Sequence, residues 1–207
     1  PGMDEFTDTG GDELGYTTTG KYSAPLGAGH ALAAGWDAGY SERREDRFER
    51  IAPSGGLPVL TDDDYLSRVS RFAVYGQDEW NVTKQWSVYL GVRWEGIQTT
   101  SSGNTFATAT SRTGVLSPLF QTLYKLPGTR GDQVRLAVTR TYKAPSTQSL
   151  IPRGFRSLEN SPTEPDFLGN PDLRPELALG LDASYEHYWA PGALLSANFS
   201  AREIKDY

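Results

Sequence analysis

The residue types best suited to bind a ligand stand together in one segment, Arg153-Gly154-Phe155-Arg156. An arginine guanidinium can donate two parallel hydrogen bonds to a carboxylate or a phosphate, and a phenylalanine ring offers a face for stacking. Together these groups suit an anionic, aromatic ligand such as a ferric catecholate. We therefore predict that Arg153, Phe155 and Arg156 bind substrate, with solvated loop arginines as the alternative interpretation.

Catalytic and metal chemistry find weaker support. The chain has two histidines, His30 and His187, and no cysteine, which argues against a serine or cysteine triad and against thiolate metal ligands. The run Asp62-Asp63-Asp64 offers the oxygen ligands that Ca²⁺ takes, but it lacks the glycine and distal glutamate of an EF-hand loop. We interpret the run as a solvated acidic loop. We predict no catalytic residue, no metal, no cofactor and no enzyme activity.

The distribution of charge bears on the partners of the chain. The segment from Ser41 to Arg50 is dense in both signs. We interpret it as a wet strand end and loop, with contact to lipopolysaccharide phosphates as the functional alternative. The net charge of -6 argues against nucleic acid as a partner, because nucleic-acid-binding proteins usually carry a basic patch.

The elements that must position these residues show the alternation of long β-strands. From Trp86 to Trp94, apolar residues occupy every second position and mostly polar residues the positions between, so one face of the strand is apolar. Residues 177–189 repeat the pattern over roughly twice the usual length of about 5–6 residues for soluble strands. We predict an all-β fold of about eight antiparallel strands, at residues 14–23, 31–43, 66–80, 86–98, 115–125, 133–142, 177–189 and 193–205.

The connections between these segments alternate in length. Short turns are predicted at residues 26–29, 81–84, 126–131 and 190–192, and long connections at about 43–65, 99–112 and 143–173. Up-and-down barrels of the outer membrane have short periplasmic turns and longer extracellular loops, so the alternation indicates a transmembrane β-barrel. Pro118 cannot donate to a strand ladder, and we expect it at a bulge or a strand start. The facing of residues 66–80 stays open.

Aromatic residues fit the two interfaces of a membrane. Trp80, Trp86, Tyr124 and Trp189 stand beside predicted short turns. The eight steps from Trp86 to Trp94 span roughly 26 Å at about 3.3 Å per residue, or about 20 Å after a tilt near 40°, against an apolar band of about 25 Å in such barrels. Two core aromatics of a soluble sheet are the alternative. No segment approaches the roughly 20 apolar residues of a membrane helix.

Four short motifs follow one another along the chain. Residues 72–95 read Y-x-Q-D-x-W, a short turn, and a strand that ends G-x-R-x-E. Ser117-Pro118 precedes a strand, residues 140–145 read R-T-Y-K-A-P, and residues 170–176 read N-P-D-L-R-P-E. In this order they resemble the barrel landmarks of TonB-dependent outer-membrane receptors, and the resemblance covers about residues 66–207.

The resemblance implies a part of a larger barrel of about 22 strands. That barrel would be plugged by an N-terminal globular domain and would import a scarce nutrient, most often a ferric siderophore, across the outer membrane of a Gram-negative bacterium. The TonB complex would drive import by gripping a segment before the plug, and lipid and lipopolysaccharide would surround the wall. Neither plug nor that segment is found in residues 1–207, so we expect a fragment of the β-barrel domain.

Other functions remain open on the sequence alone. A passive or structural barrel, porin-like or adhesin-like, would close with the strands it has. An outer-membrane hydrolase would need a cluster of catalytic residues at one rim. A soluble β-rich binding module would cover its apolar parity with a second sheet and would dissolve without detergent. An isolated fragment would have two open sheet edges, and we expect it to need further strands or another copy of itself.

Overall fold

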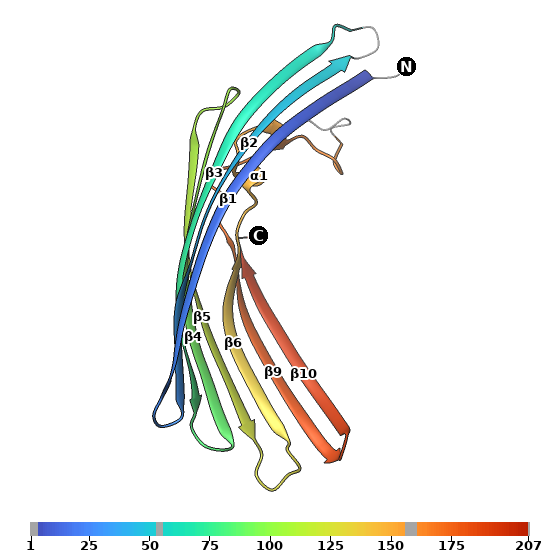
Figure 1. Cartoon of the computed structure of the whole chain (residues 1–207). Coiled ribbons are helices and arrows are strands. Elements are labelled where there is room, and N and C mark those ends of the chain that lie inside the picture. Colours follow the sequence, from blue (N-terminus) through green and yellow to red (C-terminus); the bar gives the residue numbers. More distant parts are fainter. Residues whose placement is uncertain (1–3, 53–55, 156–160, 207) are drawn as a thin grey trace.

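The computed structural model describes residues 4–52, 56–155 and 161–206. Within these ranges one antiparallel eight-stranded sheet has the order β1-β2-β3-β4-β5-β6-β9-β10, so that neighbours in the sheet follow one another along the chain (Figure 1). This confirms the predicted all-β, up-and-down fold. The strands are β1 (Asp4–Leu26), β2 (His30–Ala52), β3 (Val59–Asn81), β4 (Trp86–Gly103), β5 (Ala109–Lys125), β6 (Gln133–Lys143), β9 (Glu176–Ala190) and β10 (Ala193–Lys205).

The ends of the early strands differ from the prediction. The connections expected at about 43–65 and 99–112 are largely strand, since β2 runs to Ala52, β3 begins at Val59 and β4 runs to Gly103. The β2–β3 register is unbroken from His30↔Trp80 to Ile51↔Val59. The charged segment from Ser41 to Arg50 is predicted as a strand end and loop because the alternation of apolar and polar residues stops at Tyr40. It remains strand because its charges pair with one another and with the neighbouring strand.

The sheet has one apolar face and one polar face. Residues directly opposite each other in the ladder share a face, and the row Trp36, Val74, Trp94, Leu116 runs across four strands in this way. We call the side with these residues the apolar face and the other side the polar face. Other members of the apolar face are Leu32, Phe72, Leu90, Val92, Phe120, Leu136, Val138, Leu179 and Leu181.

The apolar face is uncovered within the described residues. Leu90 at its centre is 47% exposed and Val92 is 45% exposed, whereas a second sheet would bury both. The buried side chains instead gather on the polar face, where Ala73 is 0% and Ile151 is 2% exposed. The facing of β3, which the sequence left open, is now settled: Phe72 and Val74 lie on the apolar face. Packing covers Ala73, so this apolar residue can occupy the polar face.

Pro118 lies inside β5, and neither a bulge nor a strand start occurs there. It pairs with Val92 of β4, but the ladder to β6 begins only at Leu119, and residues 109–118 pair with β4 alone. Proline has no N–H to donate, so the β5–β6 ladder ends where its donor is missing. Figure 1 shows the β4–β5 hairpin and β6 diverging beyond this point. We call this opening the seam.

The connection from β6 to β9 is long and partly structured. It holds the four-residue helix α1 (Thr147–Leu150) and a small sheet of β7 (Gly154–Phe155) and β8 (Phe167–Leu168). The Ser146 hydroxyl caps α1 by accepting a hydrogen bond from the Ser149 N–H at 3.1 Å. Among the described residues, no helix is both long and apolar enough to cross a membrane.

Tight turns close the other end of the sheet. In the β1–β2 turn, Gly29 has a φ of +85°, and a Cβ there would lie 2.6 Å from the carbonyl oxygen of Asn81. That carbonyl belongs to the end of β3, and the Asn81 N–H in turn donates to the Gly29 oxygen at 2.8 Å. Glycine is therefore required both by the left-handed backbone and by the contact with β3. We call this the turn end and the opposite one the loop end.

Candidate functional site

The long β6–β9 connection is fixed to the polar face at the loop end through Arg153. The side chain of Arg153 is 3% exposed, and its Nη2 and Nη1 atoms lie 3.1 Å from Asp63 Oδ2 and 3.5 Å from Glu45 Oε1. Its guanidinium carbon lies 5.4 Å from the centre of the Tyr65 ring. A guanidinium held by two carboxylates and an aromatic face is a strong anchor.

Strand alternation explains why these partners converge. Glu45 of β2 and Tyr65 of β3 are direct register partners, and Asp63 stands two residues from Tyr65 on the same face. Tyr65 donates to Glu45 Oε2 at 2.8 Å, and Arg43 donates to the same oxygen at 2.9 Å. The neighbouring Asp62 and Asp64 point to the other face. Asp62-Asp63-Asp64 is therefore strand rather than loop, and its three carboxylates cannot converge on one ion.

The charge state of Glu45 follows from this arrangement. Burial alone would raise the pKa of the Glu45 carboxyl, but the hydrogen bonds from Tyr65 and Arg43 and the charges of Arg43 and Arg153 together outweigh burial. The pKa of Glu45 consequently lies below its ordinary value. Glu45 is thus an anion at neutral pH and holds the arginines that surround it.

A polar cavity of about 390 Å³ lies between α1 and the strand wall. The charged side chains of its lining are two carboxylates and one arginine, since Arg43 lies 2.9 Å from Glu45 and 3.6 Å from Glu13. A second cation, Arg153, lies 3.5 Å from Glu45. The cavity therefore offers hydroxyl and amide groups beside ion-paired carboxylates. Its lining comprises Glu13, Ser41, Arg43, Glu45, Tyr65, Ser67, Val69, Thr147, Gln148 and Ile151.

The polar face also carries paired charges between this cavity and the turn end. Asp37 lies 3.3 Å from Arg71 and 3.9 Å from Arg93, and Arg93 lies 2.8 Å from Glu95. These residues stand on β2, β3 and β4, so the pairs cross-link three strands. Charges at this density fit a wall that faces water or polar protein, as the lumen of a membrane barrel does.

The apolar face is bordered by aromatic residues. The chain has five tryptophans. Four lie on this face by register, and Trp189 lies on it because it follows Tyr185 and His187 in the alternation of β9. All five are 36–51% exposed. Trp86 begins β4, and Trp94 is the last large apolar residue of that parity, because Gly96 and Gln98 follow it. Exposed tryptophans at two levels are typical of the two interfaces of a membrane. The tryptophans are Trp36, Trp80, Trp86, Trp94 and Trp189.

Both histidines stand at the turn end beside a carboxylate. His30 Nδ1 lies 2.7 Å from Asp78 Oδ2, and its ring stacks on Trp80 at 5.0 Å. His187 Nδ1 lies 2.7 Å from Asp132 Oδ2. The Tyr188 N–H donates to Asp132 at 2.9 Å. This hydrogen bond lowers the pKa of the Asp132 carboxyl most, and the hydrogen bond with His187 lowers it further.

These histidine contacts join neighbouring strands. His30 of β2 reaches β3, and His187 of β9 reaches the β5–β6 turn through Asp132. Sequence reasoning did not foresee either carboxylate partner, although an aspartate near a turn is a usable local signal.

The predicted substrate-binding residues are placed as follows. Arg153 is buried, and its donors face the strand wall. Phe155 is in β7 and pairs with Phe167 of β8, while Arg156 lies outside the described residues. The carboxylates that hold Arg153 were not foreseen, because Asp63 precedes it by 90 positions.

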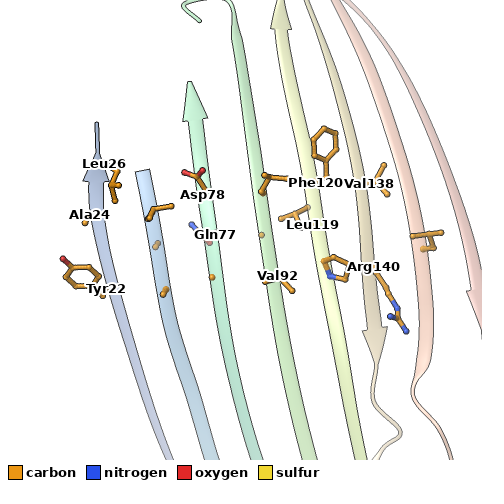
Figure 2. Close-up of a pocket in the computed structure, with 18 residues that line it drawn as sticks. Tyr22, Ala24, Leu26, Gln77, Asp78, Val92, Leu119, Phe120, Val138 and Arg140 are labelled. Atoms are coloured by element: carbon orange, nitrogen blue, oxygen red, sulfur yellow. The ribbon is translucent and has the colours of Figure 1, made fainter. Parts of the chain in front are cut away.

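A shallow depression of about 920 Å³ crosses the apolar face (Figure 2). It extends over β1 to β6 and β9, and aliphatic and aromatic side chains dominate its lining. Arg140 of β6 and Asp78 of β3 are the charged residues in that lining. Sequence reasoning did not single out Arg140 as a site residue, although it follows the outward-facing Val134, Leu136 and Val138 in parity.

Comparison with known proteins identifies a family and several solved structures that this chain resembles. A family model described as "TonB dependent receptor-like, beta-barrel" matches residues 2–207. No curated protein matches the chain. Among solved structures, the ferric yersiniabactin uptake receptor FyuA from Yersinia pestis is 13% identical with a TM-score of 0.65, over 98% of this chain and 30% of that one.

Two further structures are similar to the same extent. The copper transporter OprC is 14% identical with a TM-score of 0.68, over 96% of this chain and 32% of that one. The closed form of the ferric-catecholate import receptor Fiu from E. coli K12 is 13% identical with a TM-score of 0.61, over 96% of this chain and 32% of that one. The chain thus spans about a third of the length of these structures, and the likeness establishes a shared fold.

Proposed function

The chain belongs to the β-barrel family of TonB-dependent receptors, and from this membership we propose that it forms part of the wall of an outer-membrane importer. The full barrel would have about 22 strands around a plug, and the eight strands of this sheet would contribute about a third of it. The importer would take up a scarce nutrient, for this family most often a ferric siderophore, with energy from the TonB complex.

One observation carries this proposal: the two faces of a single sheet have opposite chemistry. Leu90 and Val92 are nearly half exposed on a face bordered by five tryptophans, while Arg71, Arg93 and Asp37 pair on the other face. In a bilayer the first face meets hydrocarbon and the second lines a polar interior. The turn end is then periplasmic and the loop end extracellular.

We also propose that the β6–β9 connection contacts cargo. Arg153 contributes by fixing this connection against β2 and β3, through Glu45 and Asp63. An anchored segment loses less conformational entropy when a ligand binds than a free loop does. Phe155 and Arg156 keep the roles predicted from their side chains, ring stacking and anion binding.

Uptake in cells tests the importer. The full-length protein is produced in an iron-starved Gram-negative strain that lacks its own catecholate receptors, with and without functional TonB. We expect entry of a labelled ferric catecholate only when both proteins are present. Entry that is independent of TonB would indicate a passive barrel, and a protein that is soluble without detergent would indicate a binding module.

Variants test the cargo contact separately. The substitutions F155A and R156Q should each weaken binding of the ferric catecholate by about tenfold, since a charge-assisted hydrogen bond or a stacked ring contributes on the order of 1–2 kcal/mol. The matched control is R130Q, at the turn end, where Arg130 donates to the Trp189 carbonyl. Equal losses in R130Q and R156Q would contradict a cargo site in this connection.

A further inference from the structure

The hairpin of β7 and β8 leaves the anchored connection at a buried crossing of two backbone segments. Gly169 follows β8 directly and is buried, and so are Ile151 and Arg153 on the segment that leads from α1 into β7. The Gly169 N–H donates to the Arg153 carbonyl oxygen at 3.4 Å, and the Asn170 N–H donates to the Ser149 carbonyl oxygen at 2.7 Å. The two segments are thus in direct backbone contact between α1 and the hairpin.

Only glycine fits at this crossing. A Cβ on Gly169 would meet the Ile151 carbonyl oxygen, and it would lie 2.8 Å from the Ile151 carbonyl carbon and 3.1 Å from the Gln148 carbonyl oxygen. All three are backbone atoms, so no side-chain rotation can make room. The Ile151 oxygen also accepts a hydrogen bond from the Arg153 N–H at 2.7 Å. Displacing this oxygen would therefore disturb the residue whose side chain anchors the connection to the polar face.

The two residues just before the crossing are apolar and exposed. Phe167 is 44% exposed and Leu168 is 69% exposed, although the adjacent Gly169 is buried. Phe167 is the register partner of Phe155, so two phenylalanines stand opposite each other in the small sheet. In Figure 1 this connection lies within the curve of the large sheet near the loop end. An aromatic ring on a fixed backbone there offers a stacking face and loses little entropy when a ligand binds.

We propose that Phe167 stacks on an aromatic ring of the cargo and that Gly169 is the positioning residue that holds Phe167 in place. Phe167 contacts the ligand, whereas Gly169 acts only through the backbone of β8. The ligand class is a metal chelate with exposed aromatic rings, and a ferric catecholate is the probe. The inference rests on the proposed function, since it requires cargo to reach the β6–β9 connection.

The test measures binding of a ferric tris-catecholate to the full-length protein in detergent by isothermal titration calorimetry. We expect F167A to weaken binding by about tenfold through the loss of one stacked ring, and F167W to bind like the wild type. G169A should weaken binding by a similar factor. The matched control is G154A, on the other arm of the hairpin, where an added Cβ would have open space around it. This control should bind like the wild type.

A double-mutant cycle distinguishes positioning from a general structural role. Because Gly169 acts through Phe167, G169A should cause no further loss of affinity in the F167A background, whereas a structural role would make the two losses multiply. Amide hydrogen exchange without ligand gives a second readout: exchange at Arg153 and Asn170 should be faster in G169A and unchanged in G154A. If G169A does not fold, N170P replaces it, because N170P removes the hydrogen bond to Ser149 without placing a Cβ at position 169. The same lack of additivity with F167A is then expected.

Several results would overturn this assignment. Unchanged binding in G169A, an equal loss in G154A or multiplied losses in the double variant would remove the positioning role of Gly169. Failure of the wild type to bind the ferric catecholate would remove the proposed cargo together with the contact to Phe167. Binding and TonB-dependent uptake that are the same in F167A and in the wild type would remove only this contact and leave the proposed function standing.

Discussion

The hairpin of β2 and β3 contains two regions that share one register and differ in what holds them. Near the turn end, from His30 to Tyr40, the apolar face is aliphatic and aromatic and has no covering layer in the described chain. Beyond Tyr40 the same strands carry Glu42, Arg44 and Asp46 on that face. The first region depends on an apolar surrounding, while the second depends on ion pairs and on the anchored connection.

The difference shows that the side-chain pattern of a strand depends on what surrounds the strand, because the same backbone ladder occurs with two different patterns. Both regions have the same antiparallel ladder, unbroken over the whole hairpin. Only the alternation changes, from apolar and polar to charged on both sides. Four substitutions or conditions distinguish the two regions, and their expected effects decrease from the loss of a buried ion pair to the loss of an exposed one.

Removal of the anchor should have the largest effect. In R153Q, Asp63 and Glu45 lose the buried cation that pairs with both, and breaking a buried pair in this way costs about 3–5 kcal/mol. The cost should appear as local opening, measured as faster amide hydrogen exchange in α1. Adding D63N should restore part of the protection. Unchanged exchange in R153Q would mean that other contacts hold the connection.

A charge at the centre of the apolar face should be nearly as costly. Leu90 lies midway between Trp86 and Trp94, and L90R should lower the free energy of unfolding from lipid vesicles by about 2–4 kcal/mol. The control Q121R introduces the same charge on the polar face, where Gln121 pairs with Tyr89. Similar losses in both variants would contradict the assignment of the two faces.

Acid should loosen the loop end without affecting the membrane region. The pKa of Glu45 in the folded chain lies below the ordinary value of 4.5. Its contribution is therefore complete above pH 4.5 and is lost as the pH falls through the lowered value. We expect exchange in α1 to accelerate in that acidic window and E45Q to abolish the acceleration. An acceleration that persists in E45Q would assign it to another carboxyl.

Exposed ion pairs on the part of β2 and β3 beyond Tyr40 should have the smallest effect on stability. The side chain of Arg44 is 70% exposed, and it lies 3.1 Å from Glu42, which Arg68 also holds at 2.9 Å. Exposed ion pairs contribute little because water screens them. The urea midpoint of R44Q should match that of the wild type within error. A clear shift of the urea midpoint would show that the strands beyond Tyr40 depend on this individual ion pair.

The sequence predicted the number, order and pairing of the strands of the large sheet, but not the small sheet of β7 and β8. Alternation between Trp86 and Trp94 is local information, and short turns such as 191–192 between β9 and β10 bring consecutive strands together. The residue types at the turns and the faces therefore sufficed. The strand ends were less predictable, because the ladder beyond Tyr40 is held by pairs such as Glu42 with Arg68, which join different strands.

The site at the loop end was the least predictable part. Arg153 could be identified as a candidate from its type and its neighbours, but its partners Asp63 and Glu45 come from two distant strands. Arg140 was noted only as the first residue of the R-T-Y-K-A-P motif, and its pairing with Leu179 becomes visible only in the register. Pro118 was recognised as an irregularity, and only the ladder shows that it ends pairing with β6.

The seam at Pro118 limits how far the protein can sink. From Ala109 to Pro118, β5 has a ladder on the β4 side only, so backbone groups on its other side depend on water. Hydrocarbon cannot satisfy such groups, and each one left there costs several kcal/mol. Because the seam extends from Pro118 to Ala109 toward the loop end, movement toward the periplasm would bring more of these groups into hydrocarbon. The missing N–H of one proline thereby limits how deep the whole sheet can lie in the membrane.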